Sequence, residues 1–431
     1  MLLIYTFKIT PRLSFVMKQI FVKILGIEIG FTTKVEDFIK HSGPKITYTK
    51  KPLQNEFFVR SNDLLFEQGI QDPETNVTLW GDVPCFFPTG ERSNIPYDIF
   101  AASFYLLSRY EEYLPHVKDI HGRFSPKDSL GYQNKFLELP VVDLWAYKLQ
   151  DLLIAKFPEL IPKNGEYKYV SLLDITISHA YSNRNLLRGV AGFILDLSRL
   201  QFKRILERIL VLLKIKKDPY DNFSLFVDWH RKYEIESIFF FQFAEYSKYD
   251  KNVSTHDQSF RSLIKHIADY SKIALGASYS SFMDIALLNR ERKGLEAVIN
   301  RPVTTARMRY NRVDVPDTYR NLVATEFTAD YTMGYTHEIG FRAGTCTPFQ
   351  FYDIPLEVEQ SVKVYSFAVH DYALKKSTDL EKVHAKLKAI KEVVKGVNGT
   401  YITVFSNELL GGEEQLDWKK IYKYILSTSH V

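Results

Sequence analysis

The chain has 431 residues, of which 45% are hydrophobic and 25% charged, the ordinary balance of a folded globular protein long enough for two domains. The net charge is only +5 and no known nucleic-acid-binding motif accompanies it, so we do not expect a nucleic-acid partner. Two distant cysteines, Cys85 and Cys346, exclude a disulfide framework and a cysteine-based metal cluster.

The first 33 residues are apolar only in short runs. Charged residues interrupt them at Lys8, Arg12, Lys18, Lys23 and Glu28. No run reaches the length of a spanning helix, and no export signal is apparent. We therefore expect a cytoplasmic protein.

Residues 1–165 are expected to form a first, smaller α/β domain. Apolar side chains at helical spacing predict a helix over Ile99–Tyr113, and a second helix is predicted over Val141–Phe157. The segment 158–165 contains two prolines and a glycine and is interpreted as a linker. The predicted strands are Leu2–Phe7 and Phe57–Val59.

Residues 166–431 are expected to form a second domain, in which short apolar strands alternate with helices. One of these helices is predicted to begin with a capping box, Thr378 with Glu381, and to end near Gly396. The alternation predicts a parallel sheet, either open or closed into a barrel. The predicted strands are Tyr169–Ile177, Ser237–Phe243, Ile273–Ser278, Val303–Met308, Val362–Val369 and Tyr401–Phe405.

Three stretches of the second domain carry a family resemblance. They read Lys217-Asp218-Pro219-Tyr220-Asp221, Asp330-Tyr331-Thr332-Met333-Gly334-Tyr335 and Gly340-Phe341-Arg342-Ala343-Gly344-Thr345-Cys346, with Pro348-Phe349 and Phe351-Tyr352-Asp353 close behind. With these stretches, residues 171–408 resemble the NodB-type polysaccharide deacetylase domain of carbohydrate esterase family four. Ser108–Tyr113 resembles a segment from a branch in which an α/β region precedes that domain. The resemblance implies a distorted (β/α)7 barrel with its site at the carboxyl ends of the strands.

The residues that such a deacetylase needs are replaced in this chain. The resemblance implies a divalent metal with carboxylate and imidazole ligands, and a separate base and acid. The positions implied for these groups hold Thr176, Ser178, Gly276, Arg309 and Ser406. Hydroxyls and a glycine are poor ligands, and an arginine repels a cation. We therefore predict no metal, no cofactor and no metal-dependent hydrolysis.

Some polar residues could still serve a rearranged site. If the first strand of the domain is bulged by two residues, Asp174 takes a carboxylate role with His179 nearby, although an ordinary strand-end role is also open. His370-Asp371 and His337-Glu338 could support different chemistry. The catalytic candidates are therefore Asp174, His179, His370 and Asp371.

A second possibility is that the altered site binds an anion. Arg307, Arg309 and Arg342 would place three guanidinium groups at one strand-end pocket, which favours a phosphate or carboxylate. Arg342 is expected to pair with Asp330 or Asp371. The alternative is that these residues hold loops together through buried hydrogen bonds. The predicted binding residues are Arg307, Arg309, Asp330, Tyr331, Arg342 and Asp371, with Tyr335 also at a motif position.

Residues 184–217 form a basic stretch with nine Lys or Arg and two acids, Asp196 and Glu207, which gives nine minus two, or +7. Val190, Phe193 and Leu197 belong to an apolar side at helical spacing. Such a helix either lies on an anionic membrane surface or packs on the sheet with a solvated charged face.

These observations predict a polysaccharide-deacetylase-like pseudoenzyme that binds a carbohydrate, a sugar phosphate or a partner in surface-glycan biosynthesis. One alternative is an active carbohydrate deacetylase with a rearranged site. Another is a peripheral-membrane scaffold that uses the basic stretch.

Overall fold

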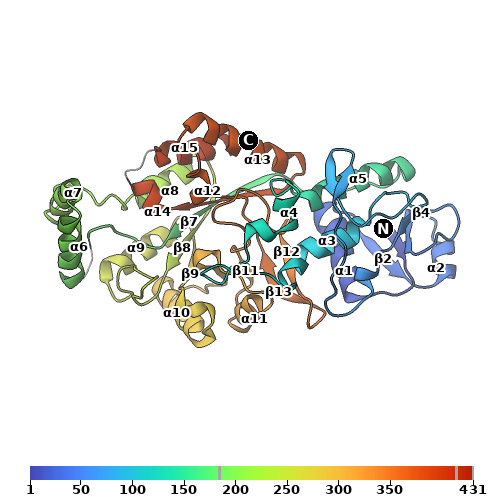
Figure 1. Cartoon of the computed structure of the whole chain (residues 1–431), viewed down its shortest axis with the longest axis horizontal. Coiled ribbons are helices and arrows are strands. Elements are labelled where there is room, and N and C mark those ends of the chain that lie inside the picture. The colour runs from blue at the N-terminus through green and yellow to red at the C-terminus, as the bar shows by residue number, and fades with distance from the viewer. Residues whose placement is uncertain (183–185, 413–415, 430–431) are drawn as a thin grey trace.

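A computed structural model describes residues 1–182, 186–412 and 416–429 of the chain. Figure 1 shows a small sheet at one end of the molecule, a large sheet in the middle and a pair of helices that projects at the opposite end. Two sheets with helices confirm the expectation of an α/β protein with a smaller N-terminal region.

The small sheet is built entirely from the first 60 residues. Its four strands are all parallel, in the order β2-β1-β3-β4. Two of them confirm predicted strands, whereas the middle two along the chain were not predicted. The elements are β1 (Leu2–Tyr5), α1 (Pro11–Met17), the π-helical η1 (Lys18–Ile24), β2 (Ile29–Thr32), α2 (Val35–Lys40), β3 (Lys45–Thr49) and β4 (Phe57–Arg60).

The helices α3 (Ile99–Leu107) and α5 (Val141–Lys156) follow a short hairpin of β5 (Thr78–Trp80) and β6 (Val83–Cys85). The predicted helix to Tyr113 was too long. Arg109 adopts the left-handed conformation, with φ of 55°, and a 3₁₀ turn follows. This break turns the Arg109 side chain into the interior, where it is fully buried.

The large sheet has nine strands in the order β12-β13-β11-β10-β9-β8-β7-β15-β14. All its pairs are parallel except β12 with β13. The strand predicted over 362–369 is divided between β13 and β14; the others are confirmed within a few residues. The strands are β7 (Lys168–Ile175), β8 (Glu236–Gln242), β9 (Lys272–Ala277), β10 (Thr305–Met308), β11 (Ala329–Asp330), β12 (Phe349–Asp353), β13 (Val358–Val364), β14 (Val369–His370) and β15 (Thr400–Ser406).

Helices connect and cover these strands. The helix α13 (Leu380–Gly396) begins one residue later than its predicted cap implies, because Asp379 rather than Thr378 accepts the first free backbone N–H groups. The other α-helices described in this unit are α6 (Leu186–Ser198), α7 (Phe202–Leu212), α8 (Phe223–Lys232), α9 (Gln258–Ala268), α10 (Ile285–Ile299), α11 (Asp317–Ala324), α12 (Asp371–Leu374), α14 (Asn407–Gly411) and α15 (Trp418–Ser429).

The two faces of the large sheet bury different clusters. Because side chains alternate along a strand, Leu172 of β7, Phe240 of β8 and Val404 of β15 share one face and form a separate apolar cluster. Two aromatic residues from outside these strands belong to the same cluster: Tyr331 directly follows β11, and Phe367 precedes β14 by two residues. The sheet therefore curves around this cluster.

The segment between β13 and β14 runs from one side of this curved sheet to the other. The N–H of Tyr365 donates to Asp330 O at 2.8 Å, and the N–H of Ala368 donates to Ile402 O at 3.0 Å. Strand pairing does not connect the two edges of the sheet within the described residues, so closure into the expected (β/α)7 barrel is not observed there.

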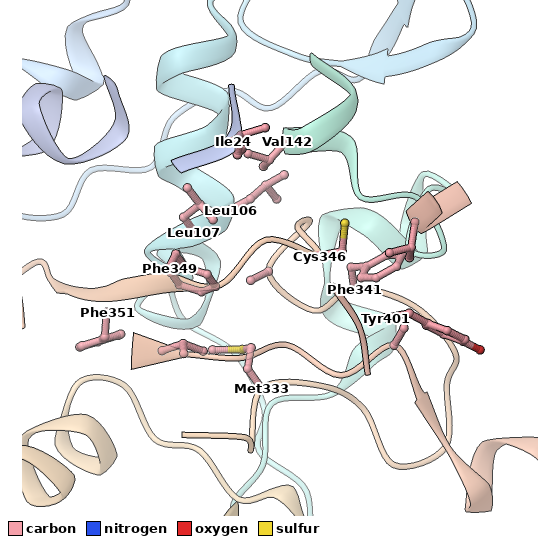
Figure 2. Packing of buried hydrophobic residues seen from close by; sticks show 14 of the residues in the cluster. Ile24, Leu106, Leu107, Val142, Met333, Phe341, Cys346, Phe349, Phe351 and Tyr401 are labelled. Atoms are coloured by element: carbon pink, nitrogen blue, oxygen red, sulfur yellow. The ribbon is translucent and has the colours of Figure 1, made fainter. Parts of the chain in front are cut away.

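One continuous hydrophobic core joins the N-terminal region to the large sheet. Figure 2 shows Ile24, Leu106 and Val142 of the first 165 residues in the same cluster as Phe341 and Phe349 of the remainder. The domain division at residue 165 stays a prediction. None of the described helices is both long and apolar enough to cross a membrane.

Candidate functional site

The candidate site lies at the carboxyl ends of the central parallel strands. Asp174 of β7 is in register with Ser406 of β15, and Gly276 of β9 is in register with Arg307 of β10. Side chains alternate along a strand, so these positions share a face with the apolar cluster around Phe240. Asp174, Gly276 and Ser406 each lie two residues beyond a member of that cluster on the same strand. The sheet thus brings together most of the predicted strand-end residues.

Arg307 is the centre of this site and is 2% exposed. Its Nε donates to both carboxylate oxygens of Asp174 at 3.0 Å, and its other nitrogens donate to Tyr331 O and, at 2.6 Å, to Asn311 Oδ1. Its guanidinium also lies 4.6 Å from the Phe367 ring centroid. Each of its three nitrogens already has a partner among the described residues, so Arg307 holds the site together.

His370 and Asp371 form an adjoining pair. The Nδ1 atom of His370 lies 2.7 Å from Asp371 Oδ1, and its Nε2 lies 4.0 Å from Asp174 Oδ2. The other oxygen of Asp371 accepts the N–H of Ser406 at 2.6 Å. The predicted catalytic candidates Asp174, His370 and Asp371 therefore do lie together.

Glu408 belongs to the same site and was missed by the sequence analysis. The hydroxyl of Thr176 donates to its carboxylate. Burial raises the pKa of Glu408, and the negative charges of Asp371 and Asp174 raise it further, against the opposing effects of Thr176 and Arg309. The sequence indicated Glu408 only by its position, two residues after the end of the strand that is now β15.

Arg309 differs from Arg307 because its hydrogen-bonding capacity is largely unused. Its Nη2 donates to Tyr249 O at 3.5 Å, and its buried Nε has no partner among the described residues. Arg309, Arg307, Asp174 and Thr176 line a cavity of about 30 Å³. This volume holds about one water molecule, so a whole sugar cannot enter it.

Four aromatic rings gather next to Arg309. His121 stacks on Tyr310 with centroids 4.7 Å apart, and Tyr249 lies 4.1 Å from Tyr279. The Arg309 guanidinium lies 4.8 Å from the Tyr310 ring centroid. The rings come from four separate segments, including one in the N-terminal region, so no local sequence pattern indicated them.

Two further arginines hold these rings in place. Arg312 donates to His121 O at 2.8 Å and to Tyr279 O at 2.9 Å, and Arg123 donates to Tyr310 O at 2.9 Å. All four rings are only partly buried. They therefore present an aromatic surface beside the Arg309 guanidinium.

The prediction that Arg342 joins this pocket and pairs with Asp330 or Asp371 was wrong. Its Nε and Nη2 donate to the two carboxylate oxygens of Glu112 at 2.8 and 2.7 Å. Glu112 also accepts from Arg109 Nε at 2.7 Å. The buried partner is supplied by the N-terminal region, which the motif comparison did not consider.

The remaining predicted residues lie outside the small cavity. Asp330 is fully buried, accepts the N–H of Thr332 at 3.1 Å, and has its pKa raised to about 6 by burial. Tyr331 stacks on Tyr365 with centroids 4.5 Å apart. Ser178 donates its N–H to Asn252, and its hydroxyl lies 3.1 Å from His179 Nδ1. Glu338 pairs with Lys376.

The residues present do not fit the divalent metal that the family resemblance implies. The Arg307 guanidinium occupies the position beside Asp174 where a cation would be needed. A Cβ atom at Gly276 would lie 3.2 Å from Gln242 N, so strand β8 restricts a ligand side chain there. No group of three or more His, Cys, Asp or Glu in the described segments is arranged to hold a metal ion. No metal-dependent step is assigned to this site.

Comparisons with known proteins match different parts of the chain. Residues 2–158 match the model of a family of unknown function, DUF7033. No curated protein matches the chain. A crystal structure of a protein assigned as a polysaccharide deacetylase from Mycobacterium smegmatis matches with a TM-score of 0.38 and 12% identity, over 62% of this chain and 87% of that one.

A polysaccharide deacetylase from Bacillus cereus also matches, with a TM-score of 0.30 and 8% identity, over 61% of this chain and 85% of that one. Both TM-scores are below 0.5.

Proposed function

We propose that residues 166–431 form a deacetylase-like domain that has lost its metal chemistry and binds the anionic group of a sugar precursor. The sequence stretches around Asp330 and Arg342 support the deacetylase-like part of this proposal, and the curved strand-end site agrees with it. Participation in surface-glycan biosynthesis is part of the same proposal.

The observation that carries the binding proposal is Arg309. A half-buried guanidinium with an unpartnered Nε is a binding group for a phosphate or carboxylate oxygen. The cavity of about 30 Å³ admits a single oxygen atom rather than a sugar ring. The ring of the sugar would rest on the half-buried aromatic rings of Tyr249, Tyr279 and Tyr310, whose faces suit the apolar side of a pyranose.

Calorimetry with N-acetylglucosamine 1-phosphate and with uncharged N-acetylglucosamine tests the proposal. We expect binding of the phosphate, weaker binding of the neutral sugar, and a roughly tenfold to hundredfold loss in Arg309→Ala, because a charge-assisted contact contributes about 1.5–3 kcal/mol. Arg290→Ala is the matched control, since Arg290 is exposed on α10. Equal affinity of Arg309→Ala and the control would overturn the proposal.

A rearranged hydrolase is the second candidate, and the raised pKa of Glu408 beside Thr176 favours it. A buried carboxyl group with a raised pKa is a candidate general acid. We expect no acetate release from acetylated amino-sugar oligomers and well under one equivalent of bound metal by elemental analysis. Acetate release that Glu408→Gln abolishes would replace the binding proposal with this one.

A further inference from the structure

The basic stretch forms two helices rather than one. Helices α6 and α7 make a hairpin between β7 and α8, and Figure 1 shows this pair apart from the other helices. The alternative in which the stretch packs on the sheet is therefore wrong. Residues 183–185 and the side chains of 186–188 and 191 are outside the described part of the hairpin, including the basic positions Arg184 and Arg188.

The hairpin exposes an unusual amount of apolar surface. On α7 and beyond it, Phe202, Leu206, Ile209 and Leu213 recur at helical spacing, and Phe202 is 64% exposed. Folded proteins seldom leave such contiguous surface without a partner. The exposed large apolar side chains of the hairpin are Val190, Phe193, Ile194, Leu195, Leu197, Leu200, Phe202, Leu206, Ile209, Leu212, Leu213 and Ile215.

Cations accompany this apolar surface. Residues 189–217 contain seven Lys or Arg and two acids, so seven minus two gives +5. Both acids are already engaged: Asp196 by the Nε of Arg208 at 3.2 Å, and Glu207 by Lys216. The charge that the hairpin presents outward is therefore positive.

The two segments at the base of the hairpin are tied together by Asp218. Asp218 accepts the N–H groups of Ala180, Tyr181 and Ser182, each at 2.9 Å, and the N–H of Tyr220 at 3.0 Å. Burial opposes ionisation of Asp218, but these backbone hydrogen bonds lower its pKa. One carboxylate thus ties the chain entering the hairpin to the chain leaving it.

Contacts inside the hairpin hold its two helices together. The Arg208 guanidinium pairs with Asp196 and lies 4.9 Å from the Tyr181 ring centroid, and the pair is buried between the helices. A Cβ at Gly192 would lie 2.8 Å from Arg208, so the helices approach closely where glycine leaves room. The exposed apolar residues consequently belong to a hairpin of defined shape.

We propose that this hairpin docks the protein on an anionic membrane surface. Its helices have 13 and 11 residues, or about 20 and 17 Å, too short to cross a hydrocarbon core of about 30 Å. They suit instead a position in the interface, with apolar side chains among the acyl chains and cations at the headgroups. A second copy of the chain is disfavoured as the occupant, because two hairpins of charge +5 repel each other.

Co-sedimentation of the full chain with vesicles tests the proposal. The probes are phosphatidylcholine vesicles with and without phosphatidylglycerol. We expect binding that requires phosphatidylglycerol and weakens as salt rises. Phe202→Ser with Leu206→Ser should reduce binding at least tenfold, because both side chains lose apolar burial in the lipid. Lys203→Glu with Arg204→Glu should remove the preference for the anionic lipid.

Leu79→Ser with Ile161→Ser is the matched control, since both residues are exposed and lie outside the α6–α7 hairpin. This control should bind vesicles like the unchanged protein. Circular dichroism establishes that each variant is folded. Unchanged binding by the Phe202 and Leu206 double variant would overturn the proposal. A second outcome would also overturn the proposal: light scattering shows a dimer that the Phe202 and Leu206 double variant abolishes, and neither protein binds vesicles.

Discussion

Arg307 places a positive charge beside Asp174, in the position that a metal ion would occupy in the site implied by the family resemblance. Its guanidinium neutralises Asp174 and donates to Tyr331 O and Asn311, which ties β10 to β7 and to the loops that follow β10 and β11. Neighbouring strands lie about 4.8 Å apart, so β7 and β10, with two strands between them, would be about 14 Å apart in a flat sheet. Curvature of the sheet brings these two side chains within hydrogen-bonding distance.

Arg307→Ala should lower the free energy of unfolding by about 3 kcal/mol, because it leaves Asp174 and Tyr331 O without their donor. Urea unfolding provides the measurement, with the exposed Arg290→Ala as the control. The double variant Arg307→Ala, Asp174→Ala should cost at least about 1 kcal/mol less than the sum of the single variants. Additive costs would show that the two side chains do not stabilise each other.

At the scale of elements, the ends of β9 and its neighbours are closely packed. Gly276 of β9 faces backbone atoms of β8, and Glu291 of α10 accepts the N–H of Ser278 just beyond β9 at 3.0 Å. Strand, loop and helix thus fix the position of Tyr279 in the aromatic surface.

Gly276→Ala should destabilise the protein by about 1–3 kcal/mol, because the new Cβ would lie 3.2 Å from Gln242 N and 3.3 Å from Phe240 O. A histidine at this position, whose side chain is larger, should cost more. Gly396→Ala is the matched control, since a Cβ there meets nothing within 4 Å. Thermal unfolding that ranks Gly276→Ala no worse than this control would contradict the prediction.

Glu291 should make stability depend on pH. Burial raises its pKa from 4.5 to about 7, with Asp250 adding to the shift and hydrogen bonds from Ser278 and Ser281 opposing it. The folded state therefore binds this proton more tightly, so the free energy of unfolding falls as pH rises from about 4.5 to about 7. Glu291→Gln should remove roughly 3 kcal/mol of that decline. Urea unfolding on both sides of this window, with the exposed Glu359→Gln for comparison, is the measurement.

At the scale of the whole molecule, an ion-pair network and a continuous core join the two regions. Glu112 binds Arg109 and Arg342, and these three side chains are at most 2% exposed. Asp143 of α5 likewise accepts the hydroxyl of Thr345 at 2.8 Å. The segment after α3 and the Arg342 loop therefore stabilise each other across the two regions.

Glu112→Gln should cost about 3 kcal/mol at neutral pH, because the buried Arg342 guanidinium loses its counter-charge and Arg109 keeps only its ion pair with Glu111. Burial opposes ionisation of Glu112, but Arg342 and Arg109 lower its pKa to about 2. Its contribution is therefore present above about pH 4.5 and is lost as pH falls toward 2. Acid titrations of stability should show a shallower loss in Glu112→Gln.

Tryptophan fluorescence tests whether the two regions unfold together. Trp80 and Trp145 report on the first region, and Trp229 and Trp418 report on the second. Because the core is continuous, single-tryptophan variants should give coincident urea transitions. Separate transitions would show that the division near residue 165 creates independently folding domains.

The sequence alone determined those features that depend on local pattern. Strand-helix alternation correctly predicted β7, β8, β9, β10 and β15 of the large sheet but missed β11, and the prediction of α5 ended one residue too late. Five of the predicted strand-end positions line one cavity, whereas Ser178 and Ser406 do not; the five are Asp174, Thr176, Gly276, Arg307 and Arg309. These features repeat along a strand or helix, so neighbouring residues carry the information.

Only the tertiary structure decided which side chains meet. Arg342 binds Glu112, Glu408 joins the strand-end site, and His121 completes the aromatic surface, although each pair of partners is distant in sequence. Helices α6 and α7 have the apolar spacing of packed helices, yet many of their described apolar side chains, such as Phe202 and Leu206, are exposed. The physical reason is that charge pairing and burial depend on the distances that the whole fold creates, which local periodicity does not contain.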